Sequence, residues 1–217
     1  MLSVGTRTIV FSSTCAVYGL PERIPITEEE VCKPANPYGE SKRMFEKILE
    51  WHARRDGVRA VFLRYFNAAG ASGRRGEDHD PETHLIPNVL KVALGQAPAV
   101  SIFGTDYPTP DGTCIRDYIH IEDLAQAHVL ALEREVFGAF NLGNGSGYSV
   151  HQVIETARYI TGHPVPTKIA SRRPGDPPVL VADASRAKRE LGWEPRIPAL
   201  TDIIRSAWEW MRQHPKG

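Results

Sequence analysis

Two short apolar runs on either side of one amphipathic helix constrain the fold of this chain most. The first run, 8–11, is β-branched and aromatic without polar alternation, and the second covers 58–66. Runs of this kind are typical of strands that are covered on both faces, as in a parallel sheet. Between them, Asn36 is a suitable N-cap, Pro37 a suitable first helical residue, and Gly57 a suitable helix end. The order strand, helix, strand predicts an α/β fold with a right-handed crossover.

The same alternation continues along the chain. We expect helices over 85–94, 122–134 and 150–161, the last opened by a capping box of Ser149 and Gln152. Strands are expected at 100–103, at 139–142 and near Lys168, and the chain closes with an amphipathic helix around 203–211. Within the first helix, an apolar stripe is expected to be core; its members are Met44, Phe45, Ile48, Leu49, Trp51 and His52.

Composition excludes several classes of partner. Formal net charge is zero with 41% apolar residues, and no basic cluster stands out, so neither nucleic acid nor an anionic membrane is an expected partner. No apolar run approaches the roughly 20 residues of a membrane span, and the N-terminus does not resemble a signal peptide. The three cysteines form no CxxC pair, so we expect free thiols, no metal site and a cytoplasmic protein.

Tyr38 and Lys42 are the first candidate catalytic pair. They are four residues apart at the start of the expected helix, so they lie on one face. The positive end of the helix dipole and the ammonium both favour a phenolate, which predicts a tyrosine whose pKa is lowered for use as a general base. A packed tyrosine beside a solvated lysine is the alternative.

A row of hydroxyls, Ser12, Ser13 and Thr14, ends the first apolar run. Ligands of open α/β sheets bind beside the carboxyl ends of the strands, which makes these hydroxyls candidate ligand contacts. A serine-rich turn that satisfies its own backbone is the alternative.

A hydroxyl at a strand end, a Tyr-x-x-x-Lys helix and a second strand ending in Phe66-Asn67 resemble the extended short-chain dehydrogenase/reductase superfamily. Within it, the resemblance is to the UDP-glucose 4-epimerases and extends over essentially the whole chain. Five segments carry it: 12–19, 36–42, 63–70, 83–87 and 102–120.

This resemblance implies a nucleotide-sugar epimerase of galactose metabolism that uses NAD as a tightly held cofactor and acts by transient oxidation at C4 of a UDP-hexose. Tyr38 is implied to take the proton from the 4-hydroxyl, Lys42 to lower its pKa and hold the cofactor ribose, and Thr14 to bond the same hydroxyl. Further cofactor contacts are implied for Tyr38 itself and for Ser12, Ser13 and Tyr65.

Eight residues are implied to bind the sugar nucleotide. Asn67 and Leu85 contact it, Phe103 lies against the uracil, and Tyr118 supports that end of the pocket. Arg116 and Arg173 grip the diphosphate, where a guanidinium fork suits anionic oxygens. Asp176 accepts from the uridine ribose, and Leu180 borders the sugar's 2-substituent, where it would leave room for an N-acetyl group. As alternatives, Phe103 is core, Arg116 pairs with Asp117, and Leu180 faces away from the sugar.

The resemblance also implies a fold class and a domain plan. The fold is the C-terminal part of a Rossmann-like parallel sheet with a smaller α/β substrate-binding domain. Residues 1–70, with 116–145 returning to them, belong to the NAD-binding domain, and 71–115 and 146–217 to the sugar-nucleotide domain. The family's glycine-rich NAD fingerprint is expected before residue 1, within roughly a hundred residues. Without that part we expect the chain neither to retain NAD nor to turn over, and with it to form a homodimer.

Two departures from the family pattern leave alternatives open. Thr14 stands where many relatives have serine, which keeps the hydroxyl. A 4,6-dehydratase needs an acid/base pair directly after Thr14, where this chain has Cys15 and Ala16. A non-catalytic sugar-nucleotide-binding remnant is the alternative outside the enzymes.

Overall fold

A three-stranded parallel sheet forms the lower half of the molecule in the computed structural model, which describes residues 1–214. Its strands are β1 (Thr8–Thr14), β2 (Arg59–Tyr65) and β6 (Gly138–Leu142), in the order β1-β2-β6. Thr8 lies opposite Arg59, and Val61 lies opposite Gly138. β2 is the central strand and is buried from Ala60 to Arg64, as expected for a strand with neighbours and helices on all sides.

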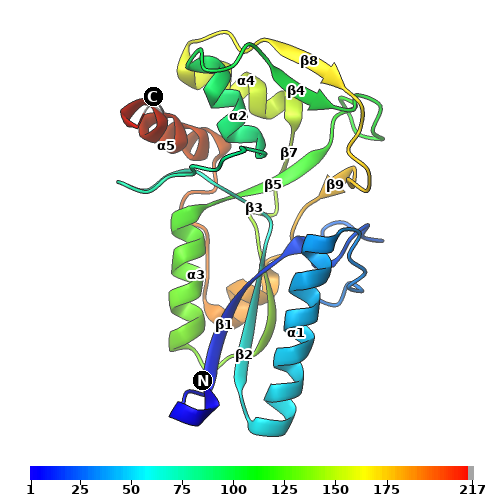
Figure 1. Ribbon diagram of the computed structural model, residues 1–217, viewed down its shortest axis with the longest axis vertical. Helices are drawn as coiled ribbons and strands as arrows, with labels where there is room; N and C mark the ends of the chain where they lie inside the picture. The colour runs from blue at the N-terminus through cyan, green and yellow to red at the C-terminus, as the bar shows by residue number, and fades with distance from the viewer. Residues whose placement is uncertain (215–217) are drawn as a thin grey trace.

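Helices cover both faces of this sheet. In Figure 1, α1 (Pro37–Asp56) lies to the right of the strands and α3 (Ile121–Glu133) to the left. Successive side chains of β2 point to opposite faces, so Phe62 packs in a cluster with Leu49 of α1, and Leu63 in a cluster with Leu124 of α3. The expected strand, helix, strand arrangement is therefore confirmed.

The ends of α1 also follow the sequence. The Asn36 side chain accepts a hydrogen bond from the backbone N–H of Gly39 at 2.8 Å, and Pro37 is the first helical residue. Gly57 closes the helix in the left-handed conformation with φ 66°. Both caps place Tyr38 in the first turn.

The apolar stripe of α1 is not core, contrary to expectation. Met44, Phe45, Ile48 and Trp51 are exposed, with 68% of Trp51 accessible, and Leu49 alone of the stripe is buried. The helix instead turns Gly39, Glu46 and Leu49 toward the sheet. Glu46 occupies the buried face because Arg64 of β2 neutralises it there, so the periodicity of apolar residues identified the wrong side.

β5 (Ile115–His120) organises a second, mixed sheet above the first. β3 (Asn67–Ala69) and β9 (Val179–Leu180) pair with β5 in parallel, and β7 (Gly147–Ser149) pairs with it in antiparallel. The register puts Asn67 beside Tyr118, and Arg116 beside Leu180. Residues from distant parts of the chain therefore meet along β5.

A helical cluster with a parallel strand pair forms the upper part of the molecule. Helices α2 (Leu85–Ala93), α4 (Val150–Thr161) and α5 (Leu200–Gln213) enclose one apolar core, and β4 (Val100–Phe103) pairs with β8 (Thr167–Ala170). The expected capping box of Ser149 and Gln152 opens α4. Short helical turns are η1 (Leu2–Val4), η2 (Cys15–Val17) and the π-helical η3 (Ala187–Leu191). Within residues 1–214, every helix is too short or too polar to cross a membrane.

Candidate active site

The first turn of α1 lies against the carboxyl end of β1. A Cβ placed on Gly39 would come within 2.5 Å of the backbone oxygen of Ala16, so only glycine allows this close approach. The approach brings Tyr38 beside Thr14, the last residue of β1. Local helix capping and one glycine therefore place the two hydroxyls together.

Thr14 has a hydroxyl that is suited to donate to a neighbour. Its side chain is buried, and Oγ1 accepts a hydrogen bond from the backbone N–H of Ala16 at 3.1 Å. A hydroxyl has one proton to donate besides its acceptor lone pairs, and the Thr14 hydroxyl is near enough to Tyr38 to lower the pKa of its phenol. Tyr38 itself is 54% exposed, so its ring can meet a ligand from solvent.

The pKa of Tyr38 is raised rather than lowered. Partial burial raises it and outweighs the lowering by the hydrogen bond from Thr14. Nζ of Lys42 donates to the backbone oxygen of Ser12 at 3.0 Å and lies 5.7 Å from the centre of the Tyr38 ring. The i and i+4 spacing correctly put both residues on one face, but it did not indicate where the ammonium points.

The other three residues expected at the cofactor lie in different environments. Ser12 Oγ is 2.8 Å from Nε2 of His128, whose Nδ1 donates to the backbone oxygen of Leu124, so Nε2 is the acceptor for the serine. The Tyr65 ring centre is 6.5 Å from that of His128. Ser13 is fully buried and donates to Glu46 at 2.7 Å, so its side chain faces the interior. His128 was not identified from the sequence, because a lone histidine on a helix has no distinguishing pattern.

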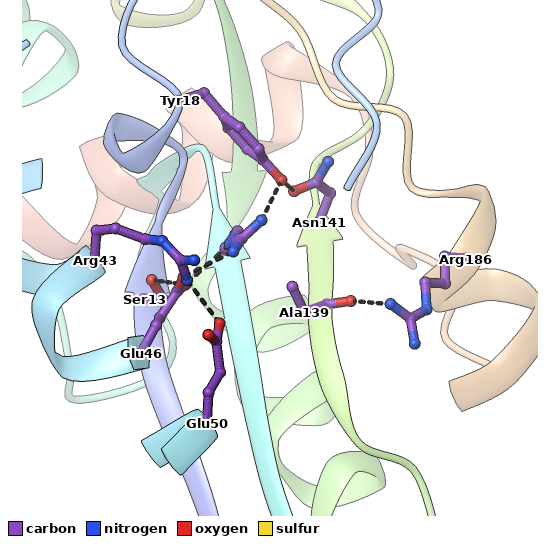
Figure 2. Close-up of polar contacts among 9 residues, drawn as sticks. Ser13, Tyr18, Arg43, Glu46, Glu50, Ala139, Asn141 and Arg186 are labelled. Atoms are coloured by element: carbon purple, nitrogen blue, oxygen red, sulfur yellow. Dashed lines mark hydrogen bonds and ion pairs between the residues drawn. The ribbon is translucent and has the colours of Figure 1, made fainter. Parts of the chain in front are cut away.

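A buried polar network lies behind this site and was also not identified from the sequence (Figure 2). The Arg64 guanidinium binds Glu46 with two hydrogen bonds of 2.9 and 2.7 Å and donates to the Tyr18 hydroxyl at 3.0 Å. Tyr18 donates in turn to Asn141 at 2.7 Å. The network joins β1, α1, β2 and β6, so it fixes the carboxyl ends of the three strands relative to one another and to the middle of α1.

Arg64 also determines the charge state of Glu46. Burial opposes ionisation of the carboxyl, but the hydrogen bonds and charge of Arg64, with smaller contributions from Ser13 and Arg43, hold its pKa below the ordinary value. Burial raises the pKa of the Tyr18 hydroxyl, so that group stays protonated and donates. The network is consequently an ion pair of Arg64 with Glu46, to which Ser13, Tyr18 and Arg43 add further hydrogen bonds.

The residues expected at the nucleotide form two contacts with one another. Arg116 makes an ion pair with Asp176, and the Arg173 guanidinium lies 4.2 Å from the centre of the Phe103 ring. The alternative in which Arg116 pairs with Asp117 is wrong, since Asp117 is buried and accepts from the backbone N–H groups of residues 144, 145 and 182. Burial raises the pKa of Asp117 to about 6.

The remaining expected contacts connect these pairs to the Tyr38 region. Leu180 packs in a buried cluster that includes Cys15 and Phe66, the neighbours of Thr14 and Asn67. The Asn67 side chain donates to the backbone oxygen of Asp117 at 3.2 Å, Tyr118 is buried, and Leu85 begins α2. Gly175, in the loop between Arg173 and Asp176, approaches Ala35 just before α1. Leu180 thus lies close to the strand ends that carry Thr14 and Asn67, while Phe103 is on the separate pair of β4 and β8.

The hydrogen-bonding groups of Lys42 and Tyr38 fit the ribose beside the nicotinamide of a dinucleotide cofactor. The Lys42 ammonium has three N–H donors, of which one binds the backbone oxygen of Ser12, and the Tyr38 hydroxyl is accessible. Ribose hydroxyls both accept and donate, so they match this pair. The fit applies to that end of a cofactor only.

The sequence profile of the NAD dependent epimerase/dehydratase family matches residues 1–143. The chain belongs to this family. The match covers β1, α1 and β2, where Thr14, Tyr38 and Lys42 lie.

Curated members of the family are similar over the whole chain. The UDP-glucose 4-epimerase of Halalkalibacterium halodurans is 55% identical over 223 residues, covering 100% of this chain and 67% of the relative. That of Streptococcus mutans is 51% identical over 100% of this chain and 67% of its own length. The chain thus spans about two thirds of the length of these relatives.

Solved structures of family members agree with the fold. A crystal structure of UDP-glucose 4-epimerase superposes with a TM-score of 0.94 at 48% identity, covering 100% of this chain and 68% of the other. The enzyme of Stenotrophomonas maltophila, with bound NAD and formylated UDP-arabinopyranose, gives 0.93 at 41% identity, covering 98% and 66%. The expected α/β fold and family are confirmed.

Proposed function

We propose that this chain provides the acid/base residues and the sugar-nucleotide site of a UDP-glucose 4-epimerase. One observation carries the proposal: Tyr38 lies beside Thr14 at the carboxyl end of β1, and Lys42 lies on the same helix face. NAD supplies the hydride acceptor at C4 of the hexose when it is bound. The 55% identity to the Halalkalibacterium enzyme supports the substrate assignment.

Tyr38 and Thr14 act together on the 4-hydroxyl of the sugar. Thr14 donates its hydroxyl proton to the substrate oxygen or to Tyr38, and Tyr38 accepts the proton that the substrate loses. Because burial raises the pKa of Tyr38, a positive charge is needed to make it a base near neutral pH. Lys42, on the same face of α1, would supply that charge.

The nucleotide binds at the residues that the family resemblance implies, from Phe103 at the uracil to Leu180 at the sugar. Arg116 and Arg173 hold the diphosphate, Asp176 accepts from the uridine ribose, and Phe103 contacts the uracil. Asn67, Leu85 and Tyr118 complete the pocket, which lies where the NAD-binding part (1–70 with 116–145) meets the sugar-nucleotide part (71–115 with 146–217). A diphosphate offers several anionic oxygens to the guanidinium, so we expect binding to replace the ion pair of Arg116 with Asp176.

The residue that follows Thr14, Cys15, argues against a dehydratase activity. The thiol is buried, and burial raises its pKa to about 12, so it cannot serve as the acid or base beside Thr14. Ala16 has no titratable group. The same position therefore supports the epimerase over the 4,6-dehydratase.

We also propose a cytoplasmic homodimer that interconverts UDP-glucose and UDP-galactose in galactose metabolism. The exposed apolar stripe of α1 supports the dimer, because isolated faces of this kind are typical of protein interfaces. The three free cysteines of the described residues fit a reducing compartment.

The decisive test is a chimera. The part of the Halalkalibacterium relative that precedes the matched region is fused in front of Met1, and conversion of UDP-galactose to UDP-glucose is measured. We expect turnover in the chimera, none in the 217-residue chain, and UDP binding by calorimetry in both. UDP binding without turnover in a folded, NAD-loaded chimera would favour the non-catalytic remnant instead.

A further inference from the structure

Two histidines and two glutamates converge on the loop that leads into α2. The loop has the pattern Glu-x-His-x-x-Glu-x-His over 77–84, and one ligand atom from each of Glu77, His79, Glu82 and His84 lies within 4.8 Å of the others. We propose that this cluster binds one divalent transition-metal ion of the zinc class. The proposal does not depend on the epimerase activity, and it differs from the expectation of no metal site, which rested on the cysteines alone.

The spacing of the ligand atoms suits a tetrahedral ion. Zinc bonds to nitrogen and carboxylate oxygen of about 2.1 Å place neighbouring ligands about 3.4 Å apart. The Nδ1 atom of His79 lies 3.1 Å from Oε1 of Glu77, and that of His84 lies 3.5 Å from Oε1 of Glu82. The separation between His79 Nδ1 and Glu82 Oε1 is 3.9 Å. His84 Nδ1 and Glu77 Oε1 are in closer contact than this spacing, so an ion fits between the four ligands once these two side chains move apart.

The ligand types select the kind of ion. Imidazole nitrogens favour zinc, copper, nickel and cobalt, whereas magnesium and calcium prefer sites made of oxygen atoms alone. Two carboxylates balance the double positive charge of the ion. The cluster therefore discriminates against magnesium.

The surroundings hold the ligands in place before an ion arrives. Oε1 of Glu82 accepts hydrogen bonds from the backbone N–H groups of Thr83 at 2.7 Å and of His84 at 2.8 Å, and 2% of its side chain is exposed. Supporting hydrogen bonds of this kind orient metal ligands. His79 and His84 are 58% and 59% exposed, so the ion has a path from solvent.

A hollow beside the cluster leaves space for a further ligand. Glu77, His79 and Glu82 line it together with Trp210 and His214 of the C-terminal segment. Gly76 packs flat on the Trp210 ring, since a Cβ there would come within 2.1 Å of Cδ2, and this contact anchors the loop on α5. Nε1 of Trp210 is buried without a hydrogen-bond partner among the described residues, so a water ligand of the ion would find a donor there.

Binding would connect the loop to the nucleotide site. His84 is the N-cap of α2, and Leu85, expected to contact the nucleotide, is the first helical residue. An ion held by both sides of the loop fixes that helix end. It also stabilises the folded chain by mass action, because the unfolded chain does not gather the four ligands.

The test is titration of the EDTA-treated 217-residue chain with ZnCl₂ by calorimetry, and with CoCl₂ by visible absorption. We expect one ion per chain, the intense bands of tetrahedral cobalt, and a raised thermal midpoint with zinc but not with MgCl₂. His79→Ala and Glu77→Gln should each weaken zinc binding at least about 10-fold. His52→Ala is the matched control, because His52 also pairs with a carboxylate, Asp56, but lies outside the four-residue cluster.

Thermal unfolding without metal shows whether each variant folds. His79→Ala changes an exposed side chain, so it is the variant least able to disturb packing. No zinc binding, or equal affinity in wild type and a folded His79→Ala, would overturn the proposal. Loss of the zinc-induced rise in thermal midpoint in His52→Ala would also overturn the proposal.

Discussion

The two ends of the proposed site hold their polar groups in different ways. At the catalytic end, Tyr38 and Lys42 share one helix, and the buried pair Glu46 and Arg64 fixes that helix against the sheet. At the nucleotide end, Arg116 and Asp176 come from segments 60 residues apart and pair with each other. Acid/base geometry is thus built into the fold, whereas nucleotide binding has to exchange one set of contacts for another.

Tyr38→Phe should separate the two ends most clearly. In the chimera we expect kcat to fall about 10² to 10⁴-fold with little change in KM, because the lost hydroxyl acts in proton transfer. Steady-state kinetics with UDP-galactose measure both. Tyr159→Phe is the control, since that tyrosine is 80% exposed on α4 and should be neutral. Turnover close to wild type in Tyr38→Phe would remove this residue from the catalytic role.

Glu46→Ala tests whether the catalytic end depends on its buried network. Removing the carboxylate leaves Arg64, 4% exposed, without its counter-charge, which should lower the free energy of unfolding by about 3 to 5 kcal/mol. Urea unfolding of the 217-residue chain measures this. Glu50→Ala is the matched control, because Glu50 binds Arg43 at a part-exposed position. This variant should lower the free energy of unfolding by well under half as much as Glu46→Ala. An equal loss of stability in the two variants would mean that burial does not increase the contribution of the pair between Glu46 and Arg64.

The pH dependence of stability gives an independent measure of the same pair. The pKa of Glu46 is lowered in the folded chain, so its contribution is complete above the ordinary value of 4.5 and is lost as pH falls below it through the folded pKa. Wild type should therefore lose more stability than Glu46→Ala on going from pH 6 to below 4. Parallel stability profiles for the two proteins would contradict this.

Arg116→Gln tests the nucleotide end. A charge-assisted hydrogen bond contributes about 1.5 to 3 kcal/mol, so UDP binding should weaken by about 10 to 150-fold. Calorimetry on the 217-residue chain measures the affinity, and Arg189→Gln, a change at a 67% exposed side chain, is the control. In the chimera, KM should rise while kcat stays near wild type. An unchanged UDP affinity would place the diphosphate elsewhere.

Leu180→Tyr should have the smallest effect, because it alters one wall of the pocket. If Leu180 borders the 2-substituent, the variant should lose activity on the N-acetylated pair relative to UDP-glucose by about 10-fold, at the lower end for one pocket contact. The ratio of kcat/KM for the two substrate pairs measures this in the chimera. An unchanged ratio would mean that Leu180, which packs with Cys15 and Phe66, faces away from the sugar.

Several parts of the site followed from local chemistry. Asn36, Pro37 and Gly57 marked both ends of α1 because caps depend on neighbouring residues, and the apolar run of β2 indicated a central buried strand. The resemblance supplied the residues of the nucleotide end, and the structure brings Arg116 beside Leu180 and Arg173 beside Phe103. The buried face of α1 was assigned wrongly, since apolar periodicity cannot show that a buried arginine will recruit a glutamate.

The sequence by itself therefore determined the order of the elements, their caps, the α/β class and the family. Only the tertiary structure decided which face of α1 is buried, that Lys42 points to Ser12, and that Arg116 pairs with Asp176 rather than with Asp117. Those outcomes depend on contacts between residues far apart in the chain. Local propensity reports the backbone of a segment, but the direction of a charged side chain is decided by the partner that folding brings to it.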